Sequence, residues 1–506
     1  MSSLGSKLIL GLGRILSFLR EYVLSQLAGR ISIALLAFLV IMSIYALVSL
    51  PPSFPVEWTQ PQAWEMYPPD APPEWAWILG YPCLKHVMEN LAQHRYSIIQ
   101  TSGGIDLSYT YTYTLPEGLN RVPSNILVLV KDLYIPQGAT NINIILTVRR
   151  PDNYTYTLIS YTTPVSPNTS YISTTLRLSS EMLARDIVNQ YLQERGWLIN
   201  SLSILGSLQE LIFKKVTEVS PAGIVVNSTI LPGDYLFKLD IVYRGVYTPP
   251  ITVAKELTLV IFGTCYGLMG TDYLGRDLYM GLLYGFPIAL AIGLSVAILS
   301  TAIGVLAGIV SGFYGGLIDE GIQRTVDVMG NIPLLPILVL IATSVQASQF
   351  IAQIQDPVAK GWTLLSIILI VLVVFGWPGL AIIIRSFTLS IKGEQYVEAA
   401  RALGAGSRRI MFRHILPQLT PYILASLVLS TPSAIIAEAG LAILGISHGL
   451  PTWGGILADA RTKGYITYWW WIFPPGILIT ITSMAFIFLG LALETYAEPR
   501  LRGSRS

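Results

Sequence analysis

Charged residues are scarce in this sequence of 506 residues. Asp, Glu, Lys and Arg make up 12% of the chain, whereas hydrophobic residues make up 52%. A soluble domain carries roughly 25% charged residues, so the composition is typical of a membrane protein. The 32 basic side chains nearly balance the 30 acidic ones, which leaves no basic surplus for a nucleic-acid partner.

Cysteine and nucleotide-binding signatures are also nearly absent. Cys83 and Cys265 are the only two cysteines, which excludes a thiolate-rich metal or iron–sulfur site. The four histidines show no ligand pattern, so we predict no metal site. We also expect no residue of this chain to do covalent chemistry, and thus no catalytic residue. The chain lacks the G-x-x-x-x-G-K-[ST] loop that cradles ATP phosphates. Any energy from ATP must therefore come from another subunit.

Long apolar runs are what the chain has instead. About 20 apolar residues cross the hydrocarbon core of a bilayer, and six such runs occur. No small-residue cleavage site follows the first, so we read it as an uncleaved anchor. The expected fold is an α-helical polytopic membrane protein with six transmembrane helices. The runs are Ile31 to Leu50, Phe286 to Gly308, Val326 to Val345, Trp362 to Ile384, Tyr422 to Leu444 and Trp470 to Ala492.

Basic residues indicate the orientation of these spans. Arginines are frequent between Arg385 and His414 and in the tail 499–506, and loops rich in Arg and Lys stay in the cytoplasm. Six spans put both termini on that side. We therefore expect a multi-pass plasma-membrane protein with cytoplasmic termini. Residues 1–30 have helical apolar spacing and precede the first transmembrane helix, 31–50, so they are expected to lie along the inner surface.

A segment of soluble character, residues 51–268, separates the first two spans. Alternating stretches such as "SYTYTYTL" and "NINIILTV" predict half-buried strands, and one helical block is expected from Glu181 to Val216. We predict a large β-rich extracellular domain inserted between the first and second spans. All three N-x-[ST] glycosylation candidates lie in it, at Asn153, Asn168 and Asn227.

The two cysteines lie near the beginning and the end of this domain. Both are then on the oxidising side of the membrane, where disulfides persist. We predict a disulfide between Cys83 and Cys265 that joins the two stalks of the domain. The alternative is two separately buried thiols.

A polar helical stretch, "EQYVEAARALGAGSRRIMFRHILPQLTP", lies between two apolar runs, from Glu394 to Pro421. Its alanines and Leu403 form a compact knob of good helix formers, and Gly404 permits a sharp turn at the helix end. Glu398 and Arg401 add polar contacts at the rim. The alternative is a polar connector without a special purpose.

This stretch resembles the EAA loop of ABC-importer permeases, a cytoplasmic helix that docks on the ATPase subunit. One departure is His414, where the family usually has Ile. The segment "GTDYLGRD" resembles the one before the second span in C-type permeases of dipeptide and oligopeptide importers. The resemblance covers about Gly270 to Arg500. It implies a five-span permease core, 269–498, with a coupling loop, 394–417, and these ATPase-coupling residues: Tyr396, Glu398, Ala399, Ala400, Arg401, Leu403 and Gly404.

The resemblance also implies a function and partners. The chain would be a permease subunit of an ATP-driven importer, not an enzyme, and would form half of the translocation pathway. Peptides or oligosaccharides would arrive from an extracellular solute-binding protein. The other partners would be a second permease subunit and cytoplasmic ATP-binding subunits, which hold ATP and Mg²⁺ in place of any cofactor in this chain.

Three further features have more than one interpretation. Glu438 is the one carboxylate deep in an apolar run, so it either lines the pathway or makes a buried hydrogen bond. Glycines at four-residue spacing allow another helix to approach closely; they are Gly304, Gly308 and Gly312. The outer motif either contacts substrate or forms a cap and a salt bridge at a helix start; its residues are Gly270, Thr271, Asp272, Gly275, Arg276 and Asp277.

Two other functions compete with transport by an ABC importer. "GISHG" matches the G-x-S-x-G pattern of an intramembrane serine hydrolase using Ser447 and His448, but that motif needs a preceding strand. A secondary transporter would show inverted repeats and several intramembrane charges. The sequence has no convincing repeat.

Overall fold

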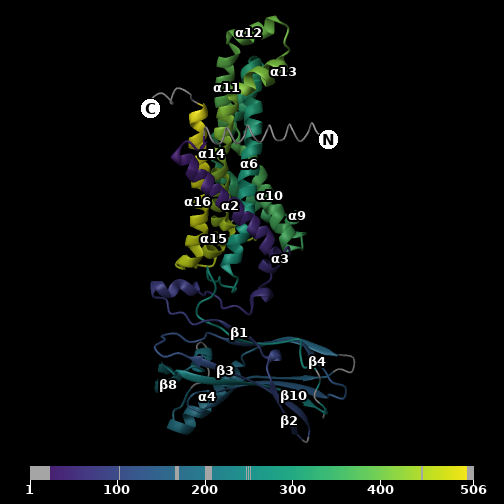
Figure 1. Cartoon of the computed structure of the whole chain (residues 1–506), viewed down its shortest axis with the longest axis vertical. Helices are drawn as coiled ribbons and strands as arrows, with labels where there is room; N and C mark the ends of the chain where they lie inside the picture. Colours follow the sequence, from purple (N-terminus) through teal and green to yellow (C-terminus); the bar gives the residue numbers. More distant parts are fainter. Residues whose placement is uncertain are drawn as a thin grey trace. The chain divides into compact units, whose positions relative to one another are not determined.

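The computed structural model describes residues 23–101, 103–165, 170–199, 208–246, 248, 250, 252–445 and 448–497. The chain forms two compact units, coloured along the sequence in Figure 1. We call Met1–Pro61 with Leu278–Ser506 the membrane unit, and Gln62–Asp277 the β unit. Most of the expected amphipathic segment 1–30 and all of the expected tail 499–506 lie outside the described residues.

The membrane unit is helical throughout its described part. Five of its helical segments are long and apolar enough to cross a bilayer: Leu27–Ser49, Leu278–Tyr314, Pro357–Lys392, Ser407–Ile443 and Trp469–Leu493. Its helices are α2 (Leu27–Ser49), α3 (Phe54–Thr59), α6 (Leu278–Tyr314), α7 (Gly316–Asn331), α8 (Leu334–Gln346), α9 (Gln349–Ala352), α10 (Pro357–Gly376), α11 (Pro378–Lys392), α12 (Gln395–Ala402), α13 (Ser407–Ile410), a π turn (Met411–Ile415), α14 (Leu416–Ile443), α15 (Trp453–Thr462) and α16 (Trp469–Ala497).

The apolar run Val326 to Val345 is not the continuous helix that the sequence predicts. Helix α7 ends at Asn331, α8 begins at Leu334, and the pair is bent by 83°. Pro333 explains the break, because proline disfavours helical backbone at the residue before it. If this bent pair counts as one span, the described residues contain six.

Glycines bring α6 and α11 into close contact. A Cβ atom added at Gly308 would lie 2.7 Å from the Ala381 carbonyl oxygen, and one at Gly312 would lie 2.8 Å from that of Arg385. At Gly304 the corresponding distance to the Trp377 oxygen is 2.9 Å. Such distances leave no room for a side chain. The close approach that the glycine spacing predicts is confirmed, and the partner is α11.

The β unit is a two-layer sandwich. One sheet has the order β1-β11-β4-β7, the other β2-β3-β10-β5-β6, and β8 pairs with β9. Buried side chains from both sheets form one apolar cluster, as the alternating sequence pattern requires. Its strands are β1 (Val87–Asn90), β2 (Tyr96–Thr101), β3 (Gly104–Leu115), β4 (Ile126–Tyr134), β5 (Asn141–Arg149), β6 (Thr155–Pro164), β7 (Tyr171–Arg177), β8 (Lys214–Val219), β9 (Val225–Ile230), β10 (Gly233–Arg244) and β11 (Glu256–Ile261).

The helical block predicted from Glu181 to Val216 is shorter than expected. Helix α4 (Ser180–Arg195) stops because Gly196 adopts a left-handed conformation, with φ of 66°. A single turn, α5 (Leu208–Leu211), follows, and β8 begins at Lys214. Val216 therefore pairs with Ser228 in a sheet. The alternation in "KKVTEV" was the signal for a strand.

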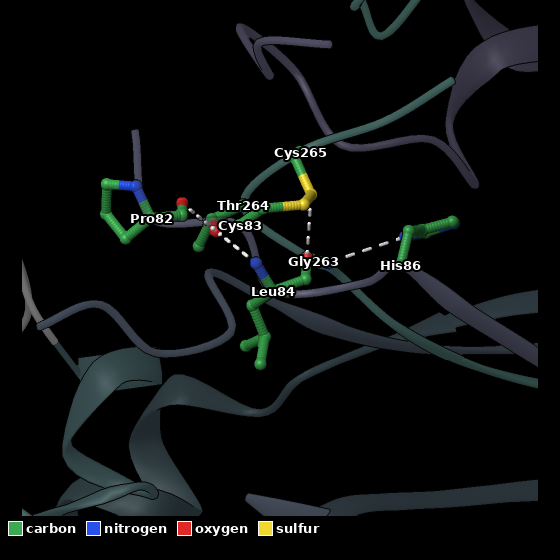
Figure 2. The surroundings of a disulfide bond; sticks show 7 residues. All are labelled: Pro82, Cys83, Leu84, His86, Gly263, Thr264 and Cys265. Atoms are coloured by element: carbon green, nitrogen blue, oxygen red, sulfur yellow. Dashed lines mark hydrogen bonds between the residues drawn. A yellow bond between two sulfur atoms is a disulfide. The ribbon is translucent and has the colours of Figure 1, made fainter. Parts of the chain in front are cut away.

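A disulfide joins the two ends of the β unit (Figure 2). The Cα atoms of Cys83 and Cys265 are 5.2 Å apart and 182 positions apart in sequence. Thr264 braces this connection: its hydroxyl accepts from Leu84 N–H at 2.9 Å and donates to the Pro82 carbonyl at 3.1 Å. The entry and exit segments are thus held together by a covalent bond and by hydrogen bonds.

Candidate functional site

Helix α12 forms a small protrusion on the membrane unit. Figure 1 shows α12 and α13 together at one end of this unit. Val397 is fully buried and packs in a cluster with Ile410, Ile384 and Phe313. The other α12 side chains are exposed or half-buried. Val397 is thus the only fully buried side chain of α12, and most of the surface of this helix is exposed.

Gly404 ends this helix as its sequence position suggests. Its φ is +81°, a conformation that residues with a Cβ rarely adopt. Its N–H donates to the Arg401 carbonyl at 3.0 Å, and the Ala405 N–H donates to the Ala400 carbonyl at 3.0 Å. These two bonds are the Schellman pattern, which satisfies the last carbonyls of a helix. The turn leaves Leu403 89% exposed.

Aromatic contacts join α12 to neighbouring helices. The Lys392 amino group and the Arg401 guanidinium lie 5.7 and 6.0 Å from the centre of the Phe313 ring, within reach of a cation–π attraction. The rings of Tyr396 and His414 have centroids 6.4 Å apart. His414, the departure from the family pattern, thus lies beside one of the predicted coupling residues.

An ion pair connects α11 to α7 shortly before α12 begins. Arg385 donates from Nε and a terminal nitrogen to the two oxygens of Asp319, at 2.6 and 2.5 Å. Ser311 of α6 also donates to Asp319, and Gln323 donates to the Ser311 hydroxyl at 3.1 Å. Three helices therefore meet at one carboxylate. Sequence reasoning missed this group, although "GLIDEGIQR" places the polar residues at helical spacing.

Glu438 is buried and makes hydrogen bonds within the membrane unit. It accepts from His448 Nε2 at 2.9 Å and from the Thr452 hydroxyl at 3.0 Å. Because His448 Nδ1 accepts from the Leu450 N–H at 3.2 Å, Nε2 carries the hydrogen. The contacts fit the interpretation of Glu438 as a buried hydrogen-bonding group. Ser447, the hydrolase candidate beside His448, lies outside the described residues.

The outer motif forms a folded turn in the β unit. Asp272 is fully buried, forms an ion pair with Arg276 and accepts from the backbone N–H groups of Leu274 and Arg276, both at 2.9 Å. The Thr271 hydroxyl donates to the Pro68 carbonyl at 2.5 Å. Asp272 therefore caps its own turn. The other motif residues belong to the same turn: Gly270 and Gly275 have positive φ, and Thr271 pairs with Asp277 in an isolated bridge.

The membrane-length helices define a helical membrane protein, and one exposed helix, α12, lies at an end of its membrane unit. The family described as "Binding-protein-dependent transport system inner membrane component" matches residues 304–503. The chain belongs to this family and is a permease of an ABC importer.

Two relatives from Bacillus subtilis agree with this membership. The chain is 33% identical over 235 residues to the dipeptide transport system permease protein DppC of Bacillus subtilis, covering 46% of this chain and 68% of that protein. For the oligopeptide transport system permease protein OppC of the same organism, the values are 34% over 236 residues, 46% and 72%. A methionine ABC transporter, MetNI, is similar at 18% identity with a TM-score of 0.32, over 43% of this chain and 94% of that one.

These relatives are transport permeases and not enzymes. The hydrolase and secondary-transporter alternatives do not fit this membership. The family match begins at residue 304, so it does not extend into the β unit, and the role of that unit must be argued from its own structure.

Proposed function

We propose that this permease forms half of a translocation pathway for peptides. The support is that its relatives are named for dipeptide and oligopeptide transport. The other half would come from a second permease subunit. A solute-binding protein outside the cell would deliver the peptide to the interface between the two.

We further propose a topology with six spans in the plasma membrane, cytoplasmic termini and an extracellular β unit. The arginines around α12 and α13 support a cytoplasmic position for these helices. The disulfide supports an oxidising environment for the β unit. Two glycosylation candidates in the β unit, Asn153 and Asn227, are exposed, whereas Asn168 lies outside the described residues.

Helix α12 is proposed to be the contact for cytoplasmic ATP-binding subunits, which would bind ATP and Mg²⁺. The observation that carries this proposal is the exposed helix with one buried anchor, Val397, and a fixed end at Gly404. Movement of the ATPase subunits would push on α12. The ion pair of Arg385 and Asp319 and the Phe313 contacts would pass this motion to α7, α11 and α6, as a rigid-body switch.

The experiment compares two neighbouring glycines. Gly404→Ala strains the left-handed turn, by roughly 1–2 kcal/mol, and should displace the exposed end of α12. Gly406→Ala is the matched control, because Gly406 has an ordinary φ of −69° and no atom within 4 Å of an added Cβ. We expect Gly404→Ala to reduce both ATPase-subunit binding and transport in purified complex, and Gly406→Ala to change neither.

A second variant tests the surface of α12 without distorting the turn at Gly404. Ala400→Asp adds a charge to a half-buried position of α12 without changing the turn. Full ATPase-subunit binding and full transport in both Gly404→Ala and Ala400→Asp would refute the coupling role of α12.

The β unit is proposed to orient the solute-binding protein at the outer mouth of the pathway. Its size and its tethered ends support a rigid docking platform. Deleting Pro68 to Val260 and joining the ends should weaken binding of the solute-binding protein to the complex. Unchanged affinity in this variant would instead leave the β unit a shield or an envelope anchor.

A further inference from the structure

The β unit exposes a compact group of large apolar side chains at one place. Trp77, Ile78 and Leu79 are 65%, 67% and 58% exposed. They belong to the 3-10 helix η3 (Glu74–Leu79). Trp75 and Leu268 are also exposed and are joined by a hydrogen bond from the indole N–H to the Leu268 carbonyl, 2.7 Å long. We call these five residues the tryptophan tip.

The tip is held rigidly by its own surroundings. The Glu74 N–H donates to the Gly267 carbonyl at 3.0 Å, and the Tyr266 N–H donates to the Pro72 carbonyl at 2.9 Å. Gly80 ends η3 in a left-handed conformation, with φ of 83°. The disulfide lies directly behind, since Cys265 is three residues before Leu268. The exposed side chains therefore lie on a segment that is fixed by hydrogen bonds and by the nearby disulfide.

The chemistry of the tip fits the boundary between lipid headgroups and acyl chains. Tryptophan concentrates at this boundary, because its ring is apolar and its N–H is polar. Lys85 lies beside the tip, on an open cavity of about 570 Å³ lined also by Glu74, Trp75, Trp77, Cys83, Gly267 and Leu268. An ammonium group at that position complements a lipid phosphate. Elsewhere in the described part of the unit, exposed large side chains include the aliphatic Ile99 and Val226 and the ring of Tyr171, but no exposed tryptophan.

The chain also keeps the tip near a membrane. Leu268 precedes Leu278, the first residue of membrane-length helix α6, by ten positions. Ten fully extended residues span at most about 36 Å. The folded turn at Asp272 and Arg276 shortens this reach. The tip is therefore within reach of a bilayer that α6 would cross.

We propose that the tryptophan tip inserts into the interfacial layer of the bilayer and anchors the β unit to the lipid surface. The partner is the phospholipid surface itself. Trp77, Ile78 and Leu79 enter the boundary layer, and Lys85 faces the phosphates.

A spin label at Ile78 tests this proposal in the intact protein. Both cysteines of the chain are in the disulfide, so Ile78→Cys supplies the single reactive thiol. Val226→Cys is the matched control, since Val226 is 60% exposed on β9. In nanodiscs of phosphatidylcholine and phosphatidylglycerol, we expect the label at position 78 to have a severalfold higher ratio of oxygen to aqueous-nickel collisions than the label at position 226.

Two results would overturn the anchor. Equal collision ratios at both positions would mean that the tip stays in water. Protection of position 78 that requires added solute-binding protein would mean a protein docking surface instead. A second readout avoids the introduced cysteine: brominated lipids should quench tryptophan fluorescence less in Trp77→Ala than in the unaltered chain, and equal quenching would also contradict insertion.

Discussion

The two units of this chain use side chains of very different size where their elements pack: glycines in the membrane unit and large rings in the β unit. In the membrane unit, α6 and α11 approach through Gly304, Gly308 and Gly312, because lipid tails are as apolar as the helices and only close van der Waals contact favours association. In the β unit, large rings such as Tyr109 and Tyr243 are fully buried, because water drives apolar area inward. The solvent of each unit explains its residue choice.

Buried polar side chains show what the two units share. Arg150 in the β unit is buried and donates to Asp152 at 2.7 Å and to the Tyr156 hydroxyl at 2.9 Å. Glu438 in the membrane unit accepts two hydrogen bonds. An unpaired charge is costly in either interior. Packing rules differ with the solvent, but the need to satisfy polar groups does not.

The largest expected effect comes from removing the disulfide, which should destabilise the β unit and not the membrane unit. Cys83→Ser combined with Cys265→Ser opens a loop of 182 positions, which the chain-entropy model values at on the order of 5 kcal/mol. We expect calorimetry of the full chain to show a lower melting temperature for the β unit only. Thiol reduction of the unaltered chain is the control and should give the same shift. An equal drop in the melting temperature of both units would mean that the two units do not unfold independently.

The next effect is a pH dependence that belongs to the β unit. His86 packs among the rings of Tyr67, Phe262 and Tyr266, and burial lowers its pKa from 6.5 to about 4. Between these values the unfolded chain binds a proton that the folded unit does not. Stability should therefore fall as the pH drops from about 6.5 to 4, by about 3 kcal/mol.

His86→Gln provides the comparison for this pH dependence. Glutamine does not titrate, so the melting temperature of the β unit should change less between pH 7 and pH 4 in this variant. The same pH dependence in both proteins would assign it to other groups.

A third effect tests the glycine contacts of the membrane unit. Gly308→Ala places a methyl group 2.7 Å from the Ala381 carbonyl oxygen and should cost about 2 kcal/mol by overpacking. Gly379→Ala is the matched control, because nothing lies within 4 Å of its added Cβ, and alanine favours a helix by up to about 1 kcal/mol. In thermal denaturation in detergent, we expect a lower melting temperature for Gly308→Ala and not for Gly379→Ala. Equal melting temperatures would mean that α6 and α11 can move apart at little cost.

The smallest effect concerns charges at the edge of the membrane unit. Arg385→Gln removes the two-pronged contact with Asp319 and should cost about 1 kcal/mol, less at high salt. Arg324→Gln is the control, since Arg324 and Glu320 are both exposed and 3.5 Å apart, so no measurable loss is expected. If the two variants lose equal stability, the Asp319 contact has no special strength.

The sequence predicts features that depend on local chemistry. Gly404 ends α12 because the conformation required there is one that glycine adopts without strain. The four-residue spacing of Gly304, Gly308 and Gly312 predicts a close helix contact because it is a property of one helix face. Both signals lie within a few residues, so no knowledge of the fold is needed.

Features that depend on chain reversal are harder to predict. Glu438 forms hydrogen bonds with His448 and Thr452 only because the chain reverses direction after α14. The hydrophobic periodicity of the sequence does not predict such a reversal. The partner of Asp319 is 66 positions away, on a helix whose position requires the whole bundle. The break at Pro333 was readable from the sequence, but the length and apolarity of the run favoured one continuous span.

The 5.2 Å between the Cα atoms of Cys83 and Cys265 has an evolutionary consequence. All strands of the sandwich lie between these two cysteines, so the chain enters and leaves the sandwich at nearly the same point. The sandwich can therefore be regarded as an insertion in a single loop. The two Cα atoms are little farther apart than the 3.8 Å between consecutive Cα atoms, so adding, losing or exchanging such a module leaves the spacing of the flanking chain nearly unchanged. The helical part of an ancestral transporter needs no rearrangement to acquire it.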